Sequence, residues 1–225
     1  MRSTVRLALI LALLALAAPV MAAPSVPTAG FQLQADGLVH MPSGGEVAST
    51  GFPLSTMIGK GPGFALTATM GLRPHLAIGA RVAHFGSTGE REAWFVDPLS
   101  PYGLGPFHEE RRLRVTMLHA ILQHRAFYGR RFEWSIDLGG GLMMSRERLV
   151  LDSATGTKAS LVGVQRDPSY TFGTGLAWWA AGNTDLVASA RWNGSFTTDG
   201  AVWSKDDSPN FMTWSLGLRY PHDTH

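Results

Sequence analysis

The strongest constraint in this sequence is an alternation of apolar and polar residues with a period of two. Successive side chains of a β-strand face opposite sides of the sheet, so this period indicates strands with one apolar and one polar face. Residues 132–145 show the pattern most clearly, because Trp134 and Ile136 fall on one face while Glu133 and Asp137 fall on the other. The 3.6-residue period of an α-helix does not separate the two classes in this way.

The pattern predicts eight strands, at residues 31–40, 64–72, 76–85, 112–128, 132–145, 170–181, 185–196 and 211–220. The fourth run changes phase, because Leu113, Val115 and Met117 are out of step with the apolar residues that begin at Leu118. A β-bulge adds one residue to a strand and thereby shifts its phase. We therefore predict a bulge near Met117 and Leu118.

The connections between these strands alternate strictly between long and short. The long ones span residues 41–63, 86–111, 146–169 and 197–210, and the short ones span 73–75, 129–131 and 182–184. This alternation is typical of an up-and-down outer-membrane barrel, in which short turns are periplasmic and long loops are extracellular. A soluble sandwich or lipocalin is the alternative, but its apolar core leaves the polar faces unexplained. We predict an all-β, eight-stranded antiparallel up-and-down transmembrane β-barrel.

Aromatic residues gather at both ends of the predicted strands. If the first strand rises from the periplasm, Phe31, Phe132 and Trp178 fall near the periplasmic rim, and Phe64 and Phe196 fall near the outer rim. Aromatic rings favour the headgroup level of a membrane. The sequence therefore predicts two aromatic girdles, one at each interface.

Residues 1–23 have the organisation of a secretory signal peptide. Arg2 and Arg6 precede a 12-residue apolar run, which is shorter than the roughly 20 residues that a transmembrane helix needs, and small residues follow it. We predict cleavage after Ala22 or Ala23, which leaves residues 24–225 as the exported barrel domain. Loss of the two arginines leaves 17 basic and 17 acidic residues. A chain with no net charge and no basic block gives no sign of nucleic-acid binding.

The last predicted strand carries the most local motif, an alternating run with a glycine and a terminal aromatic, formed by Trp214, Gly217, Leu218 and Tyr220. It resembles the terminal strand signal that the barrel-assembly machinery recognises. Residues 30–220 resemble the small eight-stranded outer-membrane barrels of Gram-negative bacteria, the OmpA-transmembrane, OmpX and opacity-like superfamily. The resemblance implies an outer-membrane location, contact with outer-membrane lipid and lipopolysaccharide, and assembly by that machinery. The tail after Tyr220, with His222 and His225, departs from the family signal.

Eight strands enclose a lumen that side chains just fill, so we expect no wide aqueous pore. The charged residues predicted to face this lumen are Asp36, Arg81, Arg125, Glu133, Asp137, Arg191 and Arg219. Buried charges need partners, which predicts an ion-pair network that plugs the barrel. Glu133 and Asp137 are the predicted partners of the arginines at positions 81, 125 and 191. A proton or small-ion path through the same network is the alternative.

A lipid A-modifying enzyme is the leading alternative function, because some eight-stranded barrels are lipid A-modifying enzymes. The lipid A deacylase family uses a His-x-Ser pair and a carboxylate, and no His-x-Ser occurs here. The nearest candidates are His84, Ser87 and Glu90, but residues three apart on a strand face opposite sides. The sequence has no cysteine, nucleotide fingerprint, phosphate loop or zincin motif, so we predict no cofactor and no metal site.

Aromatic residues in two predicted loops are candidate surface contacts: Trp94, Phe95, Tyr102 and Trp203. Loops on a rigid scaffold often carry function. These residues suit contact with lipopolysaccharide, a host surface or another envelope protein, or a lid of loops packed on themselves; the sequence names no surface partner. Uptake of small hydrophobic molecules, as in OmpW-like barrels, is a further alternative that the polar lumen disfavours. We favour a non-enzymatic barrel with a structural or surface-interaction role.

Overall fold

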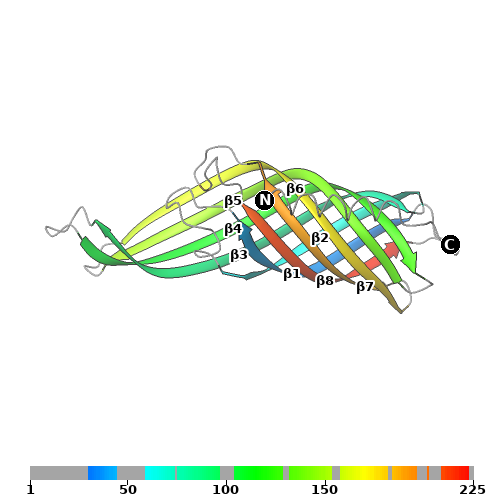
Figure 1. Ribbon diagram of the computed structural model, residues 1–225, viewed down its shortest axis with the longest axis horizontal. Coiled ribbons are helices and arrows are strands. Elements are labelled where there is room, and N and C mark those ends of the chain that lie inside the picture. The colour runs from blue at the N-terminus through cyan, green and yellow to red at the C-terminus, as the bar shows by residue number, and fades with distance from the viewer. Residues whose placement is uncertain are drawn as a thin grey trace.

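The chain forms one closed barrel of eight antiparallel strands. The computed structural model describes residues 30–44, 59–73, 75–96, 104–128, 132–153, 158–181, 184–196, 202 and 209–222. Each strand pairs with the next along the chain, and the last pairs with the first, so the ring has no open edge (Figure 1). The fold is thus the predicted up-and-down barrel. Within the described residues, no helix is long and apolar enough to cross a membrane.

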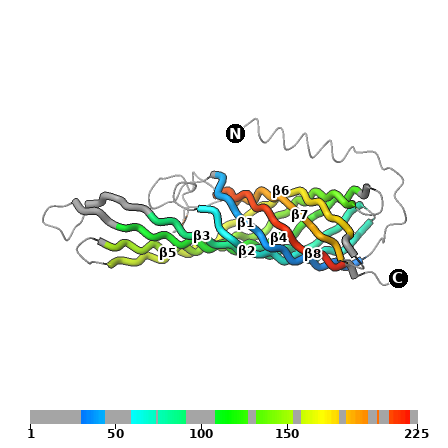
Figure 2. Tube along the Cα trace, turned by 90° about the horizontal axis from the view of Figure 1, so that it is seen from below, coloured from blue at the N-terminus to red at the C-terminus, as the bar shows by residue number. Residues whose placement is uncertain are grey.

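The strands fall into a short and a tall group. The short strands are β1 (Phe31–Gly44), β2 (Gly61–Arg73), β7 (Thr184–Ser195) and β8 (Asn210–His222). The tall strands are β3 (Leu76–Val96), β4 (Leu104–Tyr128), β5 (Phe132–Ser153) and β6 (Lys158–Ala181). Figures 1 and 2 show the tall strands projecting past the others, at the end away from the short turns. We call this projection the extension. It consists of β3 after about residue 87, β4 before about residue 114, β5 after about residue 146 and β6 before about residue 166.

The extension corrects the predicted loop boundaries. Residues 86–96 and 104–111, predicted as loop, continue β3 and β4, and most of residues 146–169 continue β5 and β6. A strand needs only about 9 to 11 residues to cross a membrane, so β3 to β6 are roughly twice that length. The predicted signal peptide, residues 1–23, lies outside the described residues, as do most of the predicted loops 41–63 and 197–210.

In the half of the barrel near the short turns, the apolar face of every strand points outward. On β5, Leu138 and Leu142 are about half exposed, whereas Glu133 and Asp137 are buried inside the barrel. Aromatic side chains lie at both ends of this outward surface: Phe132 stacks on Trp178 near the short turns, and Tyr170 packs against Phe196 near the opposite rim. An apolar exterior with a charged interior is the arrangement that a lipid environment requires.

The predicted bulge in β4 is absent. β4 pairs with β3 and with β5 without any register shift, and Leu113, Val115 and Met117 all point into the barrel. The change of phase in the sequence marks a change in the chemistry of the lumen, from polar to apolar, and leaves the backbone regular.

The end of the chain also differs from the prediction. β8 continues to His222, which pairs with Phe31 of β1, so the tail predicted after Tyr220 begins later. The seam between β1 and β8 extends over the whole length of β1, from Phe31 to Gly44. Its only irregularity is a register shift between Pro42 and Gly44.

Candidate functional site

The lumen is the candidate functional site, and it has two chemically different halves. The half near the short turns holds four buried arginines and four buried carboxylates among the described residues: Arg81, Arg125, Arg191, Arg219, Asp36, Glu133, Asp137 and Asp185. The half toward the extension holds an apolar cluster of ten residues. Equal numbers of both charge signs make the first half electrically neutral, which buried charge requires.

Arg219 of β8 holds the layer nearest the short turns. Its two terminal nitrogens donate to the two carboxylate oxygens of Glu133 at 2.7 and 2.9 Å, and its Nε donates to Asp185 at 2.8 Å. Arg125 lies beside this group, with its Nε 3.9 Å from Glu133, and donates to Thr69 and Gln123. The fork of a guanidinium matches two carboxylate oxygens, and such bidentate pairs are among the stronger polar contacts in proteins.

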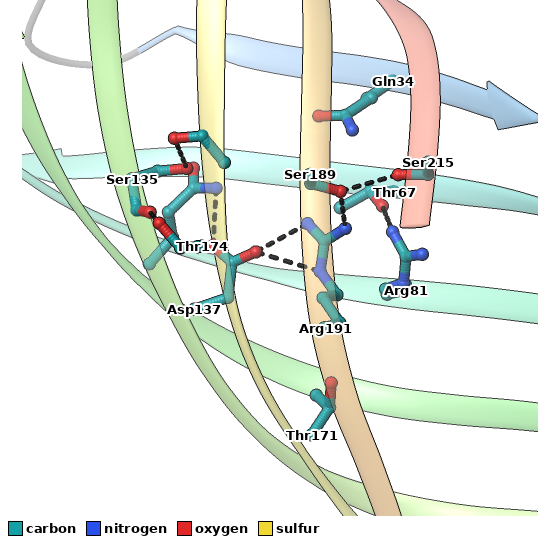
Figure 3. Close-up of polar contacts among 12 residues, drawn as sticks. Gln34, Thr67, Arg81, Ser135, Asp137, Thr171, Thr174, Ser189, Arg191 and Ser215 are labelled. Atoms are coloured by element: carbon teal, nitrogen blue, oxygen red, sulfur yellow. Dashed lines mark hydrogen bonds and ion pairs between the residues drawn. The ribbon is translucent and has the colours of Figure 1, made fainter. Parts of the chain in front are cut away.

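The next layer is centred on Asp137 and Arg191, whose charged groups face each other in Figure 3. Arg191 donates to the Oδ2 atom of Asp137 through Nε at 3.1 Å and Nη2 at 2.6 Å. Gln123 donates to the other carboxylate oxygen at 2.8 Å. Arg81 completes the layer by pairing with Asp36 at 3.2 Å, and it also donates to Thr67.

Inward-facing glycines make room for these long side chains. A Cβ atom on Gly217 would collide with the carboxylate of Asp36, and one on Gly173 would collide with the Cγ atom of Arg191. A larger residue at either position would displace a charged partner. Gly217, predicted as part of an assembly signal, therefore also has a packing role in the lumen.

The structure brings the predicted lumen charges together, but several partners differ from the prediction. Asp137 pairs with Arg191 as expected. Arg81 pairs with Asp36, and the closest partner of Glu133 is Arg219. Asp185 is a buried partner that the sequence prediction missed, although its position directly after a short turn, on the polar face of its strand, was a usable signal.

The apolar half of the lumen is packed shut. Met117, Met143 and Phe211 are completely buried there, and the cluster includes Val202 from the segment between β7 and β8. The backbone N–H of Val202 donates to Gln165 at 3.0 Å, which fixes this residue over the lumen. His40 lies at the edge of the cluster, stacked on Phe85 with ring centroids 4.4 Å apart.

A second charged group lies inside the extension. Arg111 of β4 donates to Glu147 of β5 at 2.5 Å and also to Glu109. Burial raises the pKa of Glu147, and the positive charge of Arg111 opposes that rise. This group was missed at the level of sequence because residues 86–111 and 146–169 were predicted as loops.

The weak catalytic candidates do not form a site. His84 lies on the outer face of β3, where its ring contacts Phe64 and its Nδ1 atom is 2.9 Å from the Thr116 hydroxyl. Ser87 points inward and is buried, and Glu90 is exposed on the outer side. The imidazole and the hydroxyl therefore lie on opposite faces of the barrel wall, as the strand geometry predicts.

A histidine and serine pair does occur inside the lumen. The Nε2 atom of His119 is 2.9 Å from the hydroxyl of Ser169, a distance suited to nucleophile activation. Both side chains are buried between the ion pairs and the apolar cluster, so among the described residues neither is accessible to a substrate in this conformation. Within the described residues, no three metal-binding side chains are placed to share an ion.

The structure describes the side chains of the predicted assembly signal but not those of the predicted surface contacts. Trp94 and Phe95 belong to β3, in a part whose side chains lie outside the described residues, and Tyr102 and Trp203 lie outside them entirely. Trp214, Leu218 and Tyr220 of β8 point outward and are about half exposed.

Comparison with solved structures finds the same fold among outer-membrane barrels. The outer membrane protein OprG from Pseudomonas aeruginosa matches with a TM-score of 0.50 and 10% identity, over 89% of this chain and 99% of that chain. A major outer membrane protein from Thermus thermophilus matches with a TM-score of 0.50 and 14% identity, over 87% and 100%. Neisserial surface protein A matches with a TM-score of 0.49 and 15% identity, over 84% and 96%. No protein-family model and no curated protein matches the sequence.

Proposed function

We propose that this protein is an integral outer-membrane β-barrel with a structural or surface-interaction role, and that its lumen is plugged. The observation that carries the proposal is the inverted polarity of the closed barrel, with half-exposed leucines such as Leu138 outside and ion pairs such as Asp137 with Arg191 inside. Water-exposed leucine bands of this extent are unfavourable, whereas lipid accommodates them. A cleaved leader and assembly by the barrel-assembly machinery complete the proposal.

The plug rests on two successive barriers. The paired guanidinium and carboxylate groups fill the lumen near the short turns, and the apolar cluster with Val202 fills it toward the extension. An ion would have to break buried salt bridges and then cross an apolar layer. The extension, which stands beyond the lipid-facing surface, offers the structure for contact with a partner outside the cell.

Hydrophobic uptake is less well supported. The apolar cluster is packed, since Met117 and Phe211 have no exposed surface. An apolar groove of about 1010 Å³ is lined mainly by lipid-facing side chains of β2 to β6, and none of the four lumen arginines borders it. That groove therefore provides no passage through the barrel.

The first test is the mobility of the protein from isolated outer membranes on an SDS gel, with and without boiling. We expect an unheated sample to migrate as a folded barrel and to shift on boiling. Recovery in the soluble periplasmic fraction without a shift would refute the membrane assignment and favour a lipocalin-like binder.

The second test is conductance in a planar lipid bilayer, with a wide-pore porin as positive control. The plugged lumen predicts no steady conductance of an open channel, and a stable conductance would refute the plug.

Mass spectrometry of lipid A after overexpression addresses the enzyme alternative. A mass change that His84→Ala abolishes would replace our proposal with a lipid-modifying activity.

A further inference from the structure

On the outward face of three tall strands, arginines follow the apolar residues where the extension begins. On β5, Leu142 and Met144 are followed at the next outward positions by Arg146 and Arg148. β4 changes in the same direction, from Leu118 to Arg114, and β6 changes from Tyr170 to Arg166. We call Arg114, Arg146, Arg148 and Arg166 the arginine cluster; all four side chains are exposed.

The arginine cluster carries uncompensated positive charge. Arg114 lies directly across from Arg146, and like charges directly opposite one another destabilise a sheet. Among the described residues, no carboxylate forms an ion pair with any of the four arginines.

The nearby carboxylates are engaged elsewhere. Glu110 pairs with Arg112 at 2.5 Å, and Asp152 pairs with Lys158 at 2.9 Å. On the adjacent strand β3, the exposed carboxylate of Glu90 lies across from Glu110. The arginine cluster therefore has the chemistry of an anion-binding site.

The surroundings of the cluster select a lipid as the source of that anion. Val164 lies directly across from Arg146, and Val162 lies directly across from Arg148; both valines are more than half exposed. On β6, Arg166 lies between these valines and the lipid-facing residues that end at Tyr170. The arginines are therefore interspersed with exposed apolar side chains, next to the lipid-facing wall of the barrel. A soluble anion needs no such surface, whereas a lipid presents a charged headgroup joined to apolar chains.

We propose that the arginine cluster binds the phosphorylated headgroups of outer-leaflet glycolipids, the chemistry that lipid A presents. This inference rests on the outer-membrane placement proposed above, since it requires the tall-strand end of the barrel to meet the outer leaflet. The guanidinium group is suited to this task because its planar fork donates two parallel hydrogen bonds to a phosphate. Several cations at one headgroup level reinforce one another, as in other polybasic membrane contacts.

The inference is tested by lipid binding to the full-length protein in detergent micelles, measured by native mass spectrometry. The probes are bis-phosphorylated lipid A and the same lipid without its phosphates. The test variant is Arg146→Gln with Arg148→Gln, and the control is Arg73→Gln, an exposed arginine at the short-turn end. Heat-shifted gel mobility verifies that each variant is folded.

We expect the wild type to prefer the phosphorylated lipid, and the double variant to bind it at least about tenfold more weakly. Arg73→Gln should bind as the wild type does. Equal binding of both lipids, or unchanged binding by the folded double variant, would overturn the inference.

Two competitors distinguish the source of the anion. Displacement of the lipid by millimolar inorganic phosphate would identify free phosphate as the ligand, and displacement by a sulfated oligosaccharide would identify a soluble polyanion; either result overturns the lipid assignment. Failure of this inference can be distinguished from failure of the proposed function. A folded, heat-shifted barrel without phosphate preference refutes only this inference, whereas a protein absent from the outer membrane refutes the proposed function.

Discussion

The two halves of the lumen fill the same barrel by opposite means. Near the short turns, Arg219 and Glu133 typify a network in which each charge has an opposite partner. Toward the extension, Met117 and Phe211 typify an apolar cluster, which the buried polar side chains of His40 and Gln165 border. A charged layer depends on the identity of each member, because removing one partner leaves a buried charge. An apolar layer depends on volume and tolerates exchange between residues of similar size.

Removal of one charge should have the largest effect. Glu133→Leu leaves Arg219 and Arg125 without their shared partner, so we expect the free energy of unfolding to fall by about 4 kcal/mol. Urea unfolding of the protein in lipid vesicles, followed by tryptophan fluorescence, measures the change. Glu133→Gln keeps the shape and a hydrogen-bond acceptor and should lose less. An unchanged midpoint for Glu133→Leu would remove the network hypothesis.

A cavity in the apolar half should cost somewhat less. Met117→Ala is expected to lower the free energy of unfolding by about 3 kcal/mol in the same assay, because the buried side chain leaves a void. Met117→Leu preserves most of the volume and should cost less than about 1.5 kcal/mol. The comparison between the halves fails if Met117→Leu is as costly as Glu133→Leu.

A larger residue in place of an inward-facing glycine tests whether the charged half of the lumen needs the space that the glycine leaves. Gly217→Ala should lower the free energy of unfolding by about 2 kcal/mol, because the added methyl group collides with the backbone carbonyl of Ala35 and with the carboxylate of Asp36. Gly37→Ala is the matched control on the neighbouring strand, since its Cβ atom would make only ordinary contact. Similar unfolding midpoints for both variants would contradict the proposed role of Gly217.

An exposed ion pair should show the smallest effect. Arg112 and Glu110 form a contact on the outer face of β4, where water screens the charges. Glu110→Gln is therefore expected to change the free energy of unfolding by less than about 1 kcal/mol. A loss as large as that of Glu133→Leu would show that burial does not set the importance of ion pairs in this barrel.

The fold was predictable because its pattern is local. The period of two and the short turns at residues 73–75, 129–131 and 182–184 indicate eight antiparallel neighbours without knowledge of long-range contacts. The error in β4 arose because apolar residues were assigned to the lipid side throughout. Leu113, Val115 and Met117 face an apolar part of the lumen, which no single strand reveals.

The sequence predicted which charged residues face the lumen better than it predicted which of them form ion pairs with each other. Inward-facing charges follow from strand phase, but the partner of each depends on how far neighbouring strands are staggered around the ring. Arg81 consequently pairs with Asp36, where Glu133 or Asp137 was the predicted partner. The loop boundaries differ for another reason: the outward apolar residues end before Arg146 and Arg148, whereas an extension outside the membrane can be charged on that face.

The seam between β1 and β8 bears on the order of events during folding. Its two strands lie at opposite ends of the chain, and a sheet that lacks β8 has two unpaired edges. The same strand delivers Arg219, which reaches Glu133 across 86 positions of sequence. Charge compensation of Glu133 by Arg219 and closure of the ring therefore depend on the same strand. A chain that stops short of β8 would expose both its edges and its unbalanced carboxylates, and quality control could recognise it by either defect.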